Sequence, residues 1–237
     1  MQGWEQRPNF AAILTKNKNK MKKVLLLLLM VLPLAFSSCS KDDDNEKTFS
    51  ISEKEITFSK DDTKQIKSTE DANWSVENRF IASVSNSGLV TANHVGKTIV
   101  KAKGNNGTAT CVVNVIPKYT YFQEPYLKFG ATETEIKNLE KRIFQEKRQN
   151  VLIFKGENKY VTSVFYSFEN GKMKSAGIII PFKYIDIAPN YYGERYQYME
   201  KKGEDIIMIN GYDKEHFDTM VMLSANKNGA FISYHAK

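Results

Sequence analysis

The sequence predicts two domains of different class. An all-β sandwich is expected over residues 48–117, followed over residues 118–237 by an α+β domain with an antiparallel sheet and one or two helices. Short alternating apolar runs, separated by turn residues at intervals of about 8–12 residues, predict the sandwich. All twelve tyrosines lie at or beyond Tyr119, and one capped helical pattern follows them. This change of composition and pattern predicts the second domain.

A leader precedes both domains. Two lysines are followed by an uninterrupted apolar run, Val24–Phe36, and then by small residues. A membrane-spanning helix needs roughly 20 apolar residues, so this run is too short, whereas its order is that of a secretory signal. We expect a signal peptide at residues 21–38. Residues 1–20 are interpreted as a misassigned start, with a genuine extended charged region as the alternative.

The leader ends in Phe36-Ser37-Ser38-Cys39. This motif resembles the lipobox of bacterial lipoproteins, in which the cysteine thiol is lipidated. The family usually has Leu where Phe36 stands and Gly or Ala where Ser38 stands; relaxed boxes ending in Ser-Cys resemble those of the Bacteroidetes. The resemblance implies a lipid on Cys39 and, through it, a membrane as partner.

Residues 39–47 form an acidic linker that contains Asp42-Asp43-Asp44 and Glu46. An acidic cluster directly after the cysteine resembles the surface-export signal of Bacteroidetes lipoproteins. A solvated linker is the alternative, since runs of like charge do not pack. The expected location is the outer membrane, lipid-anchored and exposed at the cell surface.

Net charge and cysteine content restrict the kinds of partner and of covalent cross-link that can be expected. Residues 1–38 hold six of the 34 basic residues and one of the 27 acidic ones, so the remainder carries a net charge of only +2. No nucleic-acid partner is expected, because that would need a clustered basic face. If Cys39 carries a lipid, Cys111 has no disulfide partner. Its place in the alternating run Thr108–Val115 predicts a buried apolar role.

The sandwich strands follow one another in order. They are predicted near Ile51–Phe58, Thr63–Lys67, Asn73–Val76, Ile81–Val84, Gly88–Ala92, Gly96–Ala102 and Thr108–Val115.

Four of these segments carry a family resemblance. Trp74-Ser75-Val76-Glu77-Asn78, Ile81-Ala82-Ser83-Val84-Ser85, Ser87-Gly88-Leu89-Val90-Thr91-Ala92 and Gly96-Lys97-Thr98-Ile99-Val100 resemble, in order and spacing, the bacterial Ig-like domain of group 2. The resemblance implies an Ig-like sandwich with Trp74 as the large aromatic between the sheets. Gly88 and Gly96 are expected in turn conformations closed to other residues. Most such domains act as spacers, and a minority contact ligands.

The second domain opens with an aromatic-rich segment and a helix. Thr132 and Glu135 have the capping-box spacing, and Ile136, Leu139 and Ile143–Phe144 recur at helical spacing. Glu124–Gly130 resembles openings of uncharacterised Bacteroidetes lipoproteins, which implies no function.

Later segments predict strands around one further helix. Strands are expected at Val151–Phe154, Tyr160–Phe168, Met173–Ile180, Ile206–Ile209, Thr219–Ser224 and Ala230–His235, a short helix at Pro189–Met199, and a hairpin at Asn170-Gly171. The order suggests a helix followed by three strands, twice over.

No catalytic or cofactor motif is present in the sequence. A Gly-rich phosphate loop and a Gly-x-Ser-x-Gly elbow are absent, so no cofactor is expected. Asp213, Glu215, His216 and Asp218 cluster in one loop, which is interpreted as solvated because no second segment with metal ligands is evident. No metal or catalytic residue is proposed from the sequence.

Tyrosines are the one compositional oddity. Tyr191, Tyr192, Tyr196 and Tyr198 fall within eight residues and are candidate ligand contacts, because tyrosine offers an apolar face and a polar tip. The alternative is that they fill an aromatic core. The expected function is a non-enzymatic binding or adhesion module with an unknown protein or glycan ligand. Alternatives are an envelope hydrolase with its site in the second domain, and a structural or inhibitory envelope protein.

Overall fold

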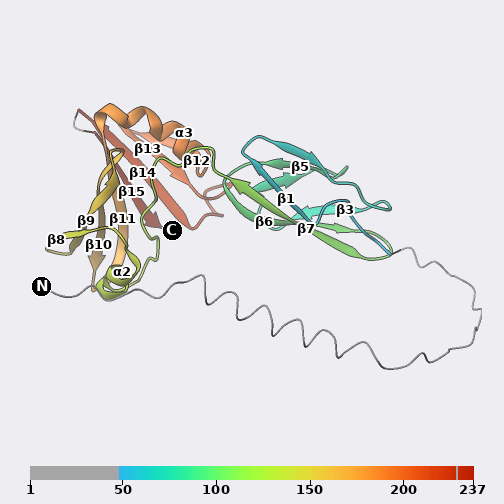
Figure 1. Cartoon of the computed structure of the whole chain (residues 1–237), viewed down its shortest axis with the longest axis horizontal. Coiled ribbons are helices and arrows are strands. Elements are labelled where there is room, and N and C mark those ends of the chain that lie inside the picture. The colour runs from blue at the N-terminus through green and yellow to red at the C-terminus, as the bar shows by residue number, and fades with distance from the viewer. Residues whose placement is uncertain (1–47, 228) are drawn as a thin grey trace, which may run out of the picture. The chain divides into compact units, whose positions relative to one another are not determined.

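The computed structural model describes residues 48–237 apart from residue 228 (Figure 1). The predictions for the leader, including the lipid on Cys39, lie outside these residues.

The first domain is a sandwich of two sheets (Figure 1). One sheet has the order β1-β7-β6-β3 and the other the order β2-β5-β4. β1 pairs with β7 in parallel, and the other neighbours are antiparallel. The strands are β1 (Glu55–Ser59), β2 (Thr63–Gln65), β3 (Asn73–Val76), β4 (Ala82–Val84), β5 (Leu89–Ala92), β6 (Gly96–Lys103) and β7 (Thr108–Ile116). The predicted all-β class is confirmed.

Local features of this sandwich match the predictions, with one refinement. Cys111 is buried in the core, and burial raises the pKa of its thiol to about 11. Gly88 has φ +83° and Gly96 has φ +153°, and a Cβ atom on Gly88 would collide with the Ile66 carbonyl oxygen. Trp74 is only half-buried and packs on the edge of the core.

The second domain is one eight-stranded antiparallel sheet with short helices, which confirms the predicted α+β class. The sheet order is β12-β13-β14-β15-β11-β10-β9-β8. The elements are α2 (Glu133–Leu139), β8 (Phe144–Arg148), β9 (Val151–Asn158), β10 (Val161–Glu169), β11 (Lys172–Pro181), η1 (Phe182–Ile187), α3 (Ala188–Gly193), β12 (Gln197–Lys202), β13 (Asp205–Ile209), β14 (Thr219–Asn226) and β15 (Gly229–Ala236).

The sheet contains the expected repeat, with four strands per unit instead of three. Each unit is a helix followed by a four-stranded meander, and the units join where Ile178 of β11 pairs with Ile232 of β15. The sequence preserves a trace of this symmetry. Phe144-Gln145-Glu146-Lys147-Arg148 on one edge strand corresponds to Tyr198-Met199-Glu200-Lys201-Lys202 on the other.

Two predicted helices are shorter than the pattern suggested. The Thr132–Glu135 capping box is present, but α2 ends at Leu139 and Phe144 begins a strand. The cause is Glu140, whose extended backbone (φ −69°, ψ 125°) turns its carboxylate inward. The second helix stops at Gly193; residues 194–196 form a turn, and Gln197 begins strand β12. The predicted Asn170-Gly171 turn is confirmed, with φ +52° and +75°.

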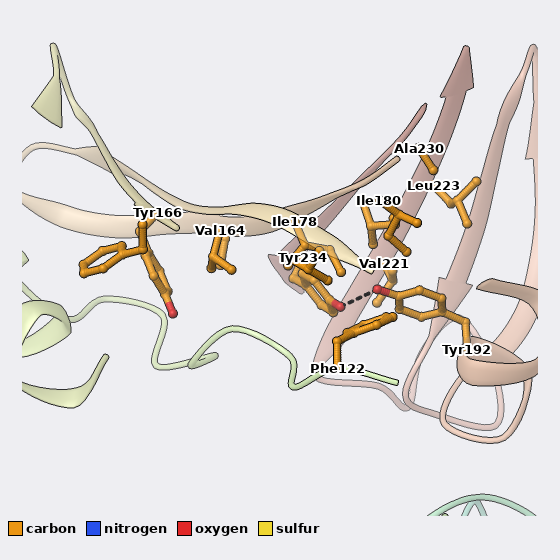
Figure 2. Close-up of a cluster of buried hydrophobic side chains, with 14 of the residues drawn as sticks. Phe122, Val164, Tyr166, Ile178, Ile180, Tyr192, Val221, Leu223, Ala230 and Tyr234 are labelled. Atoms are coloured by element: carbon orange, nitrogen blue, oxygen red, sulfur yellow. Dashed lines mark hydrogen bonds between the residues drawn. The ribbon is translucent and has the colours of Figure 1, made fainter. Parts of the chain in front are cut away.

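One face of the sheet carries the core of this domain. Figure 2 shows Val164, Ile178 and Val221 projecting from the sheet toward the layer that holds Phe122 and Tyr192. The helices and the chain before α2 supply buried residues to this inner face.

The chain before α2 bonds to a strand at its end, where the Gly130 N–H donates to the Met173 C=O of β11 (2.8 Å), and earlier along it side chains take the place of a strand partner. At Tyr119, the N–H donates to Glu194 Oε1 (3.0 Å) and the C=O accepts from Arg195 Nη2 (2.9 Å). At Gln123, the N–H donates to Glu157 Oε1 (2.8 Å) and the C=O accepts from Arg142 Nη2 (2.6 Å). We call residues 118–130 the crossing segment.

A third contact fixes the crossing segment near α2. The Tyr126 N–H donates to the Tyr166 hydroxyl at 3.0 Å, and that hydroxyl donates to Glu140 Oε2 at 2.5 Å. Arg142 Nη1 donates to the same carboxylate oxygen at 2.9 Å. The side chain of Glu140 is 1% exposed, so these partners balance the loss of its hydration.

Replacing Tyr166 by Phe removes one hydroxyl from this network. The Tyr126 N–H and a buried carboxylate oxygen each lose a partner, so the free energy of unfolding should fall by about 1–3 kcal/mol. Urea denaturation measures the change. The control is Tyr198→Phe, which removes the hydroxyl of a 59% exposed side chain. It should change the free energy of unfolding by less than about 0.5 kcal/mol. Equal effects of both variants would contradict this role of Tyr166.

Candidate functional site

The helices and the crossing segment pack on the inner face of the sheet and leave most of the opposite face uncovered, although Ile209 on that face is only 3% exposed. We call this opposite face the open face. Strand register arranges its side chains in three rows. Row A is Arg148, Val151, Ser167, Ser175, His235, Met220, Ile209 and Gln197; row B is Glu146, Ile153, Phe165, Gly177, Ser233, Met222, Ile207 and Glu200; row C is Lys155, Ser163, Ile179, Phe231, Ser224, Asp205 and Lys202.

Most charges of the open face lie on its two edge strands and the strands next to them. β8 contributes Glu146 and Arg148, and β12 contributes Glu200 and Lys202. Lys155 of β9 and Asp205 of β13 lie one strand further in, and the remaining strands carry mainly aliphatic, aromatic and serine side chains. An apolar centre with a charged rim is the anatomy of protein interfaces. Among these central residues, Phe231 is 40% exposed and Ile179 37% exposed.

A stacked aromatic pair stands at the centre. The rings of Phe165 and Phe231 lie 4.6 Å apart between centroids and 7° from parallel. Gly177, paired with Phe165 across the strands, makes this possible, because a Cβ atom there would collide with the Phe165 ring. A shallow hollow of about 620 Å³ lies beside the pair, over strands β8 to β11 and β15.

Several serine hydroxyls on the open face already have partners. The Oγ atoms of Ser167 and Ser175 are 2.5 Å apart, and Ser224 donates to Asp205 at 2.5 Å. Their hydrogen-bonding capacity is therefore partly used within the sheet, which leaves apolar contact as the main property of the face.

A second pocket of about 690 Å³ lies between the crossing segment, residues 140–143 after α2, and the end of β9, and several charged side chains line it. Two of its carboxylates, Glu140 and Glu157, are paired with Arg142 at 2.9 and 2.6 Å. Glu124 also lines it, and accepts hydrogen bonds from the hydroxyls of Tyr196 (3.1 Å) and Tyr234 (3.4 Å).

Glu124 is the carboxyl of this pocket with the most perturbed protonation. Burial raises its pKa to about 7, against the opposing effects of Arg195 and of the Tyr196 and Tyr234 hydroxyls. Around neutral pH this group therefore exists in both protonation states.

The four candidate tyrosines divide between core and surface. Tyr191, Tyr192 and Tyr196 are 2%, 1% and 6% exposed, and the Tyr192 hydroxyl lies 2.6 Å from that of Tyr234 (Figure 2). For these three the alternative role in the core holds, because α3 turns Tyr191 and Tyr192, and the turn after it Tyr196, onto the inner face. Tyr198 alone is positioned to touch a ligand from solvent.

The acidic loop with His216 is held together internally. Asp213 Oδ1 accepts from the Glu215 N–H (2.8 Å), the His216 N–H (2.9 Å) and the His216 ring. Within residues 48–227 and 229–237, no three His, Cys, Asp or Glu side chains are grouped so as to hold a metal ion. The same residues include no helix long and apolar enough to span a membrane.

Sequence reasoning missed the open face. Both alternating sets of side chains on β10, β11 and β15 contain apolar residues, a pattern that resembles a strand buried on both sides. The one available signal was the pair of charged edge strands.

Comparison with known protein families supports the predicted class of the first domain. The family described as Bacterial Ig-like domain (group 2) matches residues 45–115, as the four quoted segments imply. This match suggests a surface or adhesion-type module. No curated protein matches the chain.

The raised pKa of Glu124 predicts a pH-dependent stability. The pKa of Glu124 is near 4.5 in the unfolded chain and about 7 in the fold. The stabilising contribution of such a carboxyl is fully present below pH 4.5. This contribution is lost as the pH rises through about 7, with a slope of at most about 1.4 kcal/mol per pH unit. Denaturation curves measured between pH 4.5 and 8 should show the free energy of unfolding falling up to about pH 7 and levelling off above it. Glu124→Gln should reduce this fall. Glu135→Gln is the control, since the pKa of Glu135 is lowered to about 2 and it stays charged throughout. An unchanged slope in Glu124→Gln would refute the assignment.

Proposed function

We propose that the protein is a surface-anchored, non-enzymatic binding or adhesion module whose second domain binds its ligand through the open face, with the Ig-like domain as spacer. The observation that carries this proposal is the apolar centre of the open face, bounded by charges at both edges. Apolar surface of this kind on a soluble domain marks an interaction site.

The leader supports the location in this proposal. Cys39 follows a lipobox-like motif and precedes an acidic linker, so a lipid there holds the protein at the outer membrane with its domains outward. An Ig-like spacer then raises the second domain above the membrane surface.

An envelope hydrolase is the second candidate, and Glu124 is the observation that favours it. A carboxyl with a pKa near 7 beside a pocket suits general acid–base chemistry. The neighbouring carboxylates argue against it, because Arg142 binds both Glu140 and Glu157. Turnover of an envelope polymer that Glu124→Gln abolishes would favour this candidate over the binding module.

Binding through the open face predicts a site-specific loss. Phe231→Asp places a charge at the apolar centre and should abolish binding of the full chain to its ligand on an array of glycans, envelope proteins and the chain itself. Leu89→Asp is the matched control, because Leu89 lies on the first domain and is 39% exposed, against 40% for Phe231. Identical binding profiles for both variants would exclude the open face as the site.

Lipidation predicts a cysteine-specific label. Cells given labelled palmitate should incorporate it into the chain and into Cys111→Ala, whose thiol is buried, but not into Cys39→Ala. Cys39→Ala should also leave the membrane fraction. Equal labelling and membrane retention of Cys39→Ala would refute the anchor.

A further inference from the structure

We infer that the open face binds a second copy of this chain, so that two second domains pack face to face around a two-fold axis. This inference rests on the proposed function, because it names the occupant of the same face. Three observations support it: the size of the face, the arrangement of its edge charges and the internal symmetry of the sheet.

The size of the open face suits a stable dimer. With strands about 4.8 Å apart and alternate residues about 6.8 Å apart, eight strands and three rows cover roughly 35 by 20 Å, or about 700 Å². Two such faces bury about 1,400 Å², within the range of about 1,200–2,000 Å² for standard stable interfaces.

The edge charges make the face complementary to itself. On β8, Glu146 and Arg148 lie two residues apart on the open face, and Glu200 and Lys202 do so on β12. Within one chain Arg148 pairs with Glu146 (2.7 Å) and Lys214 with Glu200 (3.7 Å); these side chains are mostly solvent-exposed, so the pairs can be exchanged for pairs with the second copy. A two-fold axis that crosses an edge strand between the two charges sets each glutamate opposite the basic residue of the other copy. Such matching of a surface with itself is the requirement for an isologous interface.

One axis can satisfy both edges. The axis lies between rows A and B at β8 and between rows B and C at β12, so it is inclined by about one row, roughly 10°, across the sheet. The strands of the two copies then cross at about 20°, within the range of aligned sheet packing, about 30°. The axis passes over the centre of row B, where Gly177 pairs with Ser233 and neither residue carries a large side chain.

The internal repeat explains why both edges carry the same pattern. Glu146 and Glu200 occupy equivalent positions in the two meanders, as do Arg148 and Lys202. Each edge therefore presents an acid and a base in the same order, and each can meet its own counterpart.

The chemistry of the centre favours a protein surface over a glycan. The hydroxyls of Ser167, Ser175 and Ser224 are bonded within the sheet, and the stacked rings of Phe165 and Phe231 cover one face of each other. What remains available is aliphatic and aromatic contact, which a second identical face supplies.

Sedimentation equilibrium of the full chain in density-matched detergent tests the inference. We expect a monomer–dimer equilibrium whose Kd rises at least about tenfold in Phe231→Asp, equivalent to about 1.4 kcal/mol, and is unchanged in Leu89→Asp. A chain that stays monomeric at all concentrations, or a dimer unaffected by Phe231→Asp, would overturn the inference.

If Phe231→Asp fails to fold, charge reversal on β8 tests the dimer instead. Glu146→Arg sets two bases against each other and should raise Kd about tenfold, whereas Glu146→Arg combined with Arg148→Glu restores the acid–base alternation and should return Kd to within about twofold. No recovery in the double variant would overturn the proposed axis.

Failure of this inference differs from failure of the proposed function. A monomeric chain that loses binding to a glycan or to another protein on Phe231→Asp overturns the second copy and leaves the binding function intact. In the converse case, dimerisation depends on Phe231 while binding to other ligands on the array does not. That result supports a second copy as the occupant of the open face and excludes the open face as the site for the other ligands.

Discussion

The second domain depends on the crossing segment, whose backbone at Tyr119 and Gln123 is bound by side chains and not by a neighbouring strand. Glutamate–arginine pairs bind the N–H and C=O groups of Tyr119 and Gln123, as a neighbouring strand would. Buried backbone groups must be paired, so these charged side chains allow an irregular segment to lie on the core. The segment fills the inner face between α2 and α3, which at seven and six residues are too short to cover eight strands alone.

This arrangement makes the two faces of the sheet unequal. The helices and the crossing segment lie on the inner face, so many apolar residues of the opposite register, including Phe165 and Phe231, remain accessible. Leaving apolar surface in water forgoes roughly 25 cal/mol per Å², so any complementary surface that covers the open face gains that stabilisation. The exposure of this face thus follows from chain topology, and its apolar composition makes it suitable for binding a complementary surface.

Local signals made much of the fold predictable from sequence. The Asn170-Gly171 turn, the Thr132 cap and the φ of Gly88 depend on neighbours in the chain, and each was predicted. Long-range contacts explain the errors. The helix ended early because Glu140 meets Tyr166, 26 residues away. The tyrosines of α3 were ambiguous because amphipathic residues suit a core and a surface equally well, and only tertiary packing decides between them.

Polar and apolar chemistry are separated between the two faces of the sheet. Glu124, Glu140 and their arginine and tyrosine partners all contact the crossing segment or the inner face, so their protonation affects how firmly that segment is held. On the four central strands β10, β11, β14 and β15, the described residues of rows A to C include His235 as their one titratable group, while Lys155 and Asp205 lie on the strands beside them. Stability and recognition therefore respond to pH through different residues, and a change in one need not disturb the other. The repeated helix-and-meander unit accounts for this division, because both helices lie on one face of the sheet and both edges of the other face carry an acid and a base.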